Sequence, residues 1–455
     1  MEITEVSKKA KHPSSIYFCC LIFFFVHFSY YGTKLVLVLF LAEQVTKGGM
    51  GLSSTQASAM LASFMAWPYL SPIVGGWISD RYIRPKTAVS IGTCIVSIGY
   101  FIGFVGTSKI HISIMILSVI VGCGFYKGNL NTLVGNLYPK NDPRKDSAYS
   151  LTYTSINIGA MLGPFLCGLI ANNWFAEKHG GIIEVYGYRY VFLLAAIVSF
   201  IGFIIFILGQ KKFLKDAESN YKKKELLEKK RELASNPLTA EEKRSVLVIC
   251  ALSFFAMIFW IAYNQSSMTI ALYTKNYVDL SIGNFNIPIS WIDSYNGFLC
   301  VILGPIAAWI WMKLSKSKIG NLKIGTKISL GFLFLAIAFV FMIVAISKTG
   351  EDPSSGIKVS IIWIILFLTF QSIGEVCFTP IGYSIVNRLA PQKALSLFMG
   401  VWYTSLFVGK KLAGYMQIVI DQIGLLNVFI IIPIILIVFS VILLTLSKKL
   451  EEIAQ

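Results

Sequence analysis

Long apolar runs separated by short polar segments repeat along the whole 455-residue chain. About 20 apolar residues in a helix cross the hydrocarbon core of a bilayer, so each run is long enough to span a membrane. The pattern predicts twelve spans, at residues 15–43, 55–79, 87–107, 110–138, 147–172, 188–210, 245–274, 289–314, 324–347, 359–387, 394–418 and 423–447.

The composition agrees with this reading. The chain is 55% hydrophobic and 14% charged, with a mean hydropathy of +0.68, whereas a soluble domain carries about 25% charged residues. These values exclude a large soluble enzyme with an ordinary surface. They indicate an all-α polytopic membrane protein.

A net charge of +17 is compatible with nucleic-acid binding, so the positions of the basic residues along the chain must be considered. Of the 40 Lys and Arg residues, 29 lie at the N-terminus and in every second connection, at 80–86, 140–145, 211–244, 313–327, 388–393 and 448–449. This alternation is the positive-inside asymmetry, which places both termini in the cytoplasm. The charge therefore sets topology, and we expect a bilayer and no nucleic acid as the partner.

The segment 211–244 is highly charged and divides the spans into two sets of six. Six spans, a cytoplasmic linker and six spans is the layout of a two-lobed transporter with its site between the lobes near mid-membrane. We therefore predict a linker that is part helix up to Ala234. The predicted parts are a cytoplasmic segment 1–14, a first lobe 15–210, a linker 211–244, a second lobe 245–447 and a tail 448–455.

The loop after the second span reads GGWISDRYIRPK, from Gly75 to Lys86. It resembles the G-x-x-x-D-R-x-G-R-R loop of the major facilitator superfamily, in which an acid and nearby arginines help lock the lobes on the cytoplasmic side. By this resemblance Asp80, Arg81 and Arg84 are gating residues. The alternative is a positive-inside loop with one acid.

The sequence shows no sign of catalytic or metal chemistry. The eight cysteines form no CxxC pair, there are only four histidines, and no nucleotide-binding loop or nucleophile–base pair occurs in an extramembrane domain. We predict no enzyme activity, no metal and no cofactor.

Charged side chains stand inside several predicted spans, where each costs about 2.5–3.5 kcal/mol on insertion scales and marks a functional candidate. Lys34, Lys127 and Glu375 are central. Asp293 lies five residues after Pro288, so it either faces a cavity or reaches the interface. The charged residues in the spans are Lys34, Lys127, Asp293, Glu375, Lys410 and Lys411.

Lys410 and Lys411 could each extend to the interface, but neighbouring helical positions point about 100° apart. One of the two must therefore face protein. Together these charges predict a wet central cavity, with lysines in the first lobe and Glu375 in the second. Such a cavity suits a small zwitterion, such as a dipeptide or an amino acid. Neutral hydrogen-bonding groups would come from Tyr30, Tyr31, Tyr69, Asn157 and Asn296, which in the alternative only join helices.

Several long motifs resemble the proton-dependent oligopeptide transporter family, a branch of the major facilitator superfamily with twelve helices in two six-helix lobes. The motifs cover most of the chain and lie at 27–41, 122–138, 141–164, 259–273, 287–297 and 374–402. The resemblance implies that Lys127 and Lys34 bind the peptide carboxylate, Lys127 also taking part in coupling, and that Glu375 binds the peptide amino terminus. It also implies pocket tyrosines (Tyr30, Tyr31, Tyr69), asparagines on the peptide backbone (Asn157, Asn296) and aromatics shaping side-chain pockets (Trp260, Trp402).

The departures from the family pattern concern proton coupling. The first-span E-x-x-E-R motif is replaced by Phe23, Val26 and His27, and the seventh-span F-E-Q motif has Asn264 in place of its glutamate, part of a gating ion pair. His27, which titrates near neutral pH when unperturbed, and Asp293 are the candidate replacements as proton carriers, beside Lys127. The alternative is an uncoupled protein.

We therefore predict a transporter of di- or tripeptides or peptide-like solutes that works by alternating access, with atypical or absent proton coupling. The alternative is a proton-independent facilitator or exporter of an anionic or carboxylate-rich metabolite, such as a siderophore-like compound. We expect a monomer in a plasma membrane. The compact loops favour the inner membrane of a bacterium.

Overall fold

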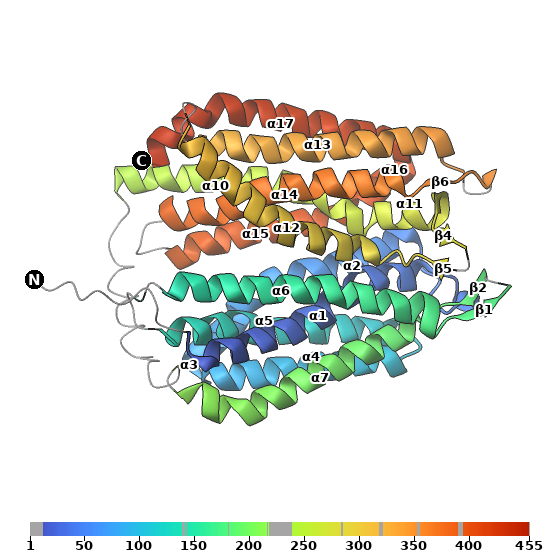
Figure 1. Ribbon diagram of the computed structural model, residues 1–455, viewed down its shortest axis with the longest axis horizontal. Coiled ribbons are helices and arrows are strands. Elements are labelled where there is room, and N and C mark those ends of the chain that lie inside the picture. The colour runs from blue at the N-terminus through green and yellow to red at the C-terminus, as the bar shows by residue number, and fades with distance from the viewer. Residues whose placement is uncertain are drawn as a thin grey trace, which may run out of the picture.

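The computed structural model shows an elongated bundle of helices that lie roughly side by side (Figure 1). It describes residues 12–138, 142, 144–180, 182–215, 217, 239–283, 285–317, 322–352, 355–389 and 395–454. Within these ranges, eleven helical stretches are long and apolar enough to cross a membrane. Most of the predicted N-terminal segment and of the predicted linker lies outside the described residues, at 1–11, 216 and 218–238.

The first half of the chain forms one group of helices and a hairpin. Its elements are α1 (Ser14–Ala42), η1 (Val45–Lys47), α2 (Ser54–Ala66), η2 (Trp67–Tyr69), α3 (Ser71–Arg81), α4 (Pro85–Val105), α5 (Lys109–Asn136), α6 (Arg144–Leu169), η3 (Ile170–Trp174), β1 (Glu177–His179), β2 (Ile182–Val185) and α7 (Tyr188–Phe213). Strands β1 and β2 pair antiparallel.

The second half forms the other group. Its elements are α10 (Ala240–Tyr263), η4 (Asn264–Ser267), α11 (Thr269–Tyr277), β3 (Val278–Asp279), β4 (Ser281–Ile282), β5 (Phe285–Asn286), α12 (Trp291–Ser315), α13 (Ile324–Thr349), β6 (Val359–Ser360), α14 (Ile362–Leu389), α15 (Leu395–Ala413), α16 (Met416–Ile423) and α17 (Leu425–Ala454). Strand β3 pairs parallel with β6, and β4 pairs antiparallel with β5.

Most predicted spans coincide with one helix, but two are broken. The predicted span 55–79 is interrupted at η2, where Pro68 and Pro72 stand, because proline removes a backbone donor and clashes with the preceding turn. The predicted span 245–274 is interrupted at η4. The predicted span 394–418 ends earlier, at Ala413, and the short helix α16 follows it.

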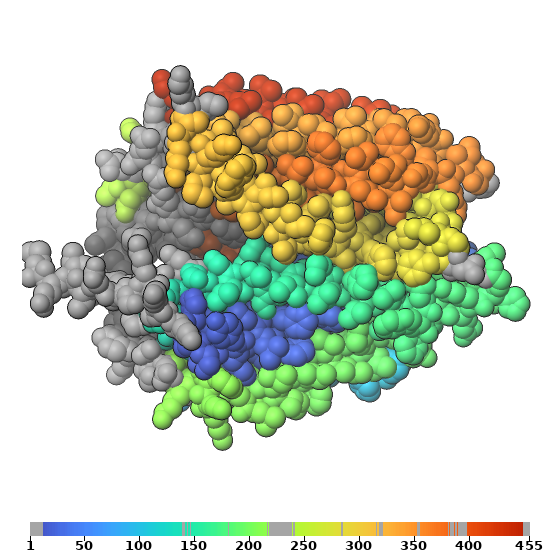
Figure 2. Space-filling model, viewed as in Figure 1, coloured from blue at the N-terminus to red at the C-terminus, as the bar shows by residue number. Residues whose placement is uncertain are grey.

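Helices α1–α7 pack mainly with one another, and so do α10–α17, while α6 with α12 and α2 with α15 join the two groups. In the ribbon and space-filling views the blue-to-green group lies below the yellow-to-red group (Figure 2). The site described below lies where these two groups meet.

Glycines bring two of these helix pairs close together near the predicted site. A Cβ atom at Gly163 of α6 would lie 2.4 Å from the carbonyl oxygen of Phe28 on α1. A Cβ atom at Gly374 of α14 would lie 2.8 Å from the carbonyl oxygen of Gly331 on α13. Small residues permit this backbone approach in membrane helices, and Gly374 thereby sets the position of the next residue, Glu375.

Polar contacts join the groups at the helix ends remote from the start of α1. Lys275 on α11 forms an ion pair with Glu43, which follows α1 and is 4% exposed. Thr55 of α2 donates a hydrogen bond of 2.8 Å to Asp421 of α16. The bundle is therefore held together across the groups at this end.

Candidate functional site

A cavity of about 210 Å³ lies at the centre of the bundle, between the two groups of helices. A larger cavity of about 570 Å³ shares Tyr153, Asn157, Cys300, Glu375 and Thr379 with it. The central cavity is lined by Tyr30, Tyr31, Lys34, Met65, Tyr69, Tyr153, Ile156, Asn157, Ala160, Trp260, Tyr263, Asn264, Asp293, Asn296, Gly297, Cys300, Glu375, Thr379 and Lys410. Most of the predicted binding residues are thus brought to one place.

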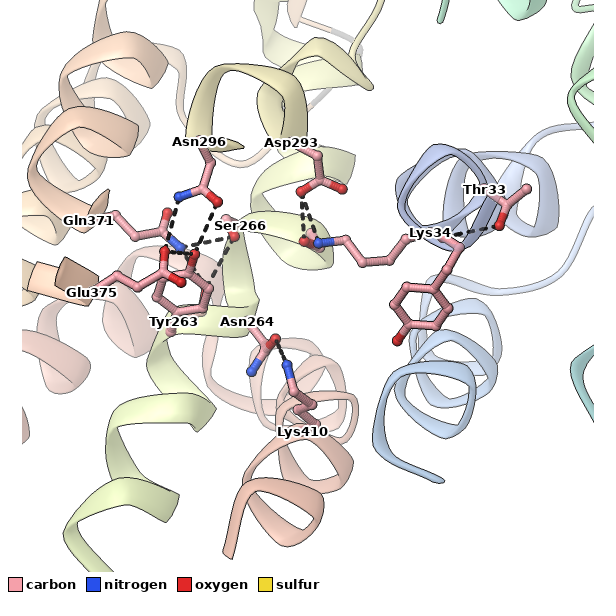
Figure 3. A network of polar contacts seen from close by, with 12 residues as sticks. Thr33, Lys34, Tyr263, Asn264, Ser266, Asp293, Asn296, Gln371, Glu375 and Lys410 are labelled. Atoms are coloured by element: carbon pink, nitrogen blue, oxygen red, sulfur yellow. Dashed lines mark hydrogen bonds and ion pairs between the residues drawn. The ribbon is translucent and has the colours of Figure 1, made fainter. Parts of the chain in front are cut away.

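Glu375 on α14 is held by hydrogen bonds that all reach one of its oxygens; Figure 3 shows Tyr263 and Asn296 beside it. Its Oε2 accepts from the hydroxyl of Tyr263 at 2.5 Å, from Asn296 Nδ2 at 3.3 Å and from Cys300 Sγ at 3.4 Å. Within the described residues Oε1 makes no hydrogen bond. A carboxylate positioned by one oxygen has the other available for a ligand cation.

The break between α10 and α11 is stabilised by side-chain amides. Gln371 on α14 donates to the carbonyl oxygen of Tyr263 at 2.9 Å, and Gln265 donates to the carbonyl oxygen of Ala413 at 3.2 Å. A broken membrane helix needs such replacements for lost backbone hydrogen bonds. The break brings Tyr263 and Asn264 to the cavity wall.

Lys34 and Asp293 form an ion pair across the two groups. The distance from Lys34 Nζ to Asp293 Oδ1 is 3.0 Å, and the side chains are only 12% and 8% exposed. Ser267 also donates to Asp293 Oδ1, at 3.3 Å. Of the two positions considered for Asp293 from the sequence, the structure shows the cavity, because Asp293 lines it and pairs there with Lys34.

The two neighbouring lysines of α15 differ as their helical positions require. Lys410 is 7% exposed, lines the central cavity and donates to Asn264 Oδ1 at 3.2 Å (Figure 3). Lys411 donates to Ser63 Oγ on α2 at 2.5 Å. Lys410 is therefore the one that brings its charge to the cavity.

Lys127 and His27 lie beside the lining residues and are not among them. The ammonium group of Lys127 lies 4.4 Å from the centre of the Tyr69 ring. His27 is 7% exposed, donates from Nδ1 to the carbonyl oxygen of Phe23 at 2.8 Å, and its ring stacks 6.1 Å from Tyr31. Both residues are thus one side chain away from the cavity.

Other predicted residues lie elsewhere. Trp402 is 2% exposed and packs 6.3 Å from the ring of Phe378, outside the cavity lining. The predicted gating residues Asp80, Arg81 and Arg84 lie around the end of α3 and the start of α4, where Arg81 covers the ring of Trp77.

Sequence reasoning did not assign a role to several lining residues. Tyr263, Cys300 and Tyr153 were not among the predicted site residues, and Lys410 was noted only as a charge within a span. For Lys410 the available signal was its charge within a span. No sequence pattern related Cys300 to the carboxylate that it contacts.

Two groups of membrane helices around a charged central cavity define a transporter of the major facilitator fold. Solved structures share this fold. A peptide transporter of the POT family in complex with sulfate superposes with a TM-score of 0.84, at 24% identity over 98% of this chain and 97% of that one. A POT family transporter in complex with a thioalcohol-conjugated peptide has a TM-score of 0.82, at 22% identity over 96% of this chain and 97% of that one.

The chain belongs to the POT family, whose sequence profile matches residues 86–226 and 212–432. It is therefore a multi-pass protein of the plasma membrane. The uncharacterized transporter YclF of Bacillus subtilis is 28% identical over 97% of this chain and 95% of its own length. The peptide transporter YePEPT of Yersinia enterocolitica is 27% identical over 88% of this chain and 86% of its own length. The di-/tripeptide transporter of Lactococcus lactis is 25% identical over 94% of both chains.

Proposed function

We propose that this protein carries di- or tripeptides, or peptide-like zwitterions, across the membrane. The observation that carries the proposal is the charge arrangement of the central cavity, with Lys34 and nearby Lys127 on the first group and Glu375 on the second. Opposite charges at two ends of a cavity match the carboxylate and ammonium ends of a short peptide. Named relatives from Yersinia and Lactococcus are peptide transporters, which supports this substrate class.

Glu375 would bind the peptide amino terminus through Oε1. Tyr263 and Asn296 hold the carboxylate in place, so little ordering is needed when the ligand arrives. Lys127 would attract the peptide carboxylate, because no carboxylate of the described residues forms an ion pair with it.

We also propose transport by alternating access, with termini in the cytoplasm and the two lobes as predicted. The contacts Glu43–Lys275 and Thr55–Asp421 would then close the outer end. The 570 Å³ cavity would extend the central one toward the inside. Breaking the outer contacts while the inner ends approach would expose the same site to the other face.

Asp293 is the better candidate for proton coupling. It lines the cavity and joins the two groups through Lys34, so its protonation would break a contact between lobes. His27 contacts only neighbours on α1 among the polar partners described. The coupling acids of the family motif are replaced by Phe23 and Val26, so Asp293 would act from another helix.

A second candidate function keeps the fold and changes the solute. Lys34, Lys127 and Lys410 lie in or beside the cavity, and among its described lining residues only Asp293 and Glu375 carry negative charge. This excess of positive charge favours an anionic metabolite, moved without protons as a facilitator or exporter.

The test is uptake of labelled dialanine into proteoliposomes, with and without an imposed inward proton gradient. We expect Glu375→Gln to abolish uptake, because the ammonium group loses its counter-charge, and Glu184→Gln, on the exposed hairpin, to leave uptake unchanged. Accumulation above equilibrium only with the gradient would support coupled peptide transport. Dialanine uptake equal to that of empty liposomes would reject the peptide proposal in favour of the anionic solute.

A further inference from the structure

Lys410 is a buried cation that the peptide-binding arrangement does not use. It lies near the end of α15, is 7% exposed, and its ammonium group lines the central cavity (Figure 3). Its one hydrogen bond in the described part of the chain goes to an uncharged group, Asn264 Oδ1, at 3.2 Å. A charge at this depth costs several kcal/mol unless it is balanced or solvated.

Neither of the two acids that line the cavity, Asp293 and Glu375, forms an ion pair with Lys410. Asp293 pairs with Lys34 at 3.0 Å, and Glu375 is held by Tyr263 and Asn296. In the described residues no carboxylate lies within ion-pair distance of Lys410. Its positive charge is therefore left for something that enters the cavity.

A second lysine approaches the same aromatic ring. The ammonium group of Lys127 lies 4.4 Å from the centre of the Tyr69 ring, and that of Lys410 lies 5.3 Å from it. Lys410 also lies 4.7 Å from the ring of Trp260. Aromatic faces stabilise a cation through their quadrupole but do not cancel its charge, so two like charges near one ring favour an anion between or beside them.

We propose that Lys410, beside Tyr69, forms an anion subsite that binds a second negative group of the substrate, in addition to the peptide carboxylate that Lys127 attracts. The group is the side-chain carboxylate of an acidic dipeptide or an equivalent anionic substituent. This inference rests on the proposed function, because it assumes that the peptide backbone occupies the central cavity. Asn264 leaves the subsite open, since an acid at that position would lie against Lys410 and neutralise it.

The test compares uptake of Ala-Asp with uptake of Ala-Asn, which has nearly the same shape and no side-chain charge. In proteoliposomes Lys410→Met should lower the ratio of Ala-Asp to Ala-Asn uptake about tenfold or more, since a charge-assisted contact to the substrate is lost. Asn264→Glu should lower it similarly without removing the lysine, because the new carboxylate occupies the position of the ligand anion. Lys411→Met removes the neighbouring charge of α15 and should leave the ratio unchanged.

The outcomes separate this inference from the proposed function. The subsite alone would be overturned if the unaltered protein takes up dialanine but the ratio of Ala-Asp to Ala-Asn uptake is unchanged in both Lys410→Met and Asn264→Glu. Absence of dialanine and Ala-Asn uptake by the unaltered protein would overturn the proposed function. If a variant does not transport, binding is compared instead, from the increase in melting temperature that each dipeptide causes in the purified protein. The same difference between Ala-Asp and Ala-Asn in the variant and in the unaltered protein would again overturn the subsite.

Discussion

The ion pair between Lys34 and Asp293 joins the two groups of helices and can be broken by one isosteric change, Asp293→Asn. The charged atoms are 3.0 Å apart and the side chains are 12% and 8% exposed. Removing one partner of a fully buried pair costs about 3–5 kcal/mol, whereas exposed pairs contribute about 1 kcal/mol or less. Because both side chains also border a cavity, we expect the free energy of unfolding to fall by about 1–3 kcal/mol.

The assay is a double-mutant cycle on the purified protein. Asp293→Asn, Lys34→Met and the double variant are compared by thermal melting at one scan rate, followed by tryptophan fluorescence. Each single change should lower the melting temperature, and the double variant should be more stable than the sum of the single effects predicts. Exchange of the two charges, with Lys34→Asp and Asp293→Lys together, should recover part of the loss.

Additive effects of the two single changes would refute the reasoning, because residues that do not interact add to within about 0.5 kcal/mol. Asp421→Asn is the matched control. Asp421 is exposed and accepts a hydrogen bond from Thr55 at 2.8 Å, so its change should alter stability by no more than about 0.5 kcal/mol.

Three further changes test other parts of the site. Lys127→Met should reduce dialanine uptake about tenfold or more if Lys127 binds the peptide carboxylate, and an unchanged rate would assign it a structural role. His27→Phe should leave any pH dependence of uptake in place if Asp293 carries the proton; loss of the dependence would assign that role to His27. Glu43→Gln, which breaks the ion pair with Lys275, should increase labelling of Cys300 by an impermeant thiol reagent from outside, in a variant whose other cysteines are serine; equal labelling would mean that this pair does not hold the outer end closed.

The hydrophobic pattern predicted the membrane helices well because the bilayer imposes a length on each apolar run. It did not predict the breaks at η2 and η4. At η4 the amide side chain of Gln371, on a helix distant in sequence, satisfies the freed carbonyl group of Tyr263. A sliding window along one segment contains no information about such a partner.

Charge within the spans pointed to residues that the structure brings to one cavity, since an ionised group in hydrocarbon needs a polar surrounding. Lys34 and Glu375 line the cavity as expected, and Lys127 lies beside it. Trp402 packs against Phe378 outside the cavity lining. Its position could not be predicted, because aromatic side chains occur both in hydrophobic cores and in binding pockets.

The sequence by itself determined the membrane class, the family and which side chains carry charge in the spans, because these follow from residue type and local order. Only the tertiary structure decided that Asp293 pairs with Lys34, that Lys410 rather than Lys411 faces the cavity, and that Asn264 is its partner. Lys410 and Asn264 are 146 positions apart in the sequence, and Lys34 and Asp293 lie on different groups of helices. They depend on how helices rotate and approach one another, which the packing of the whole bundle sets.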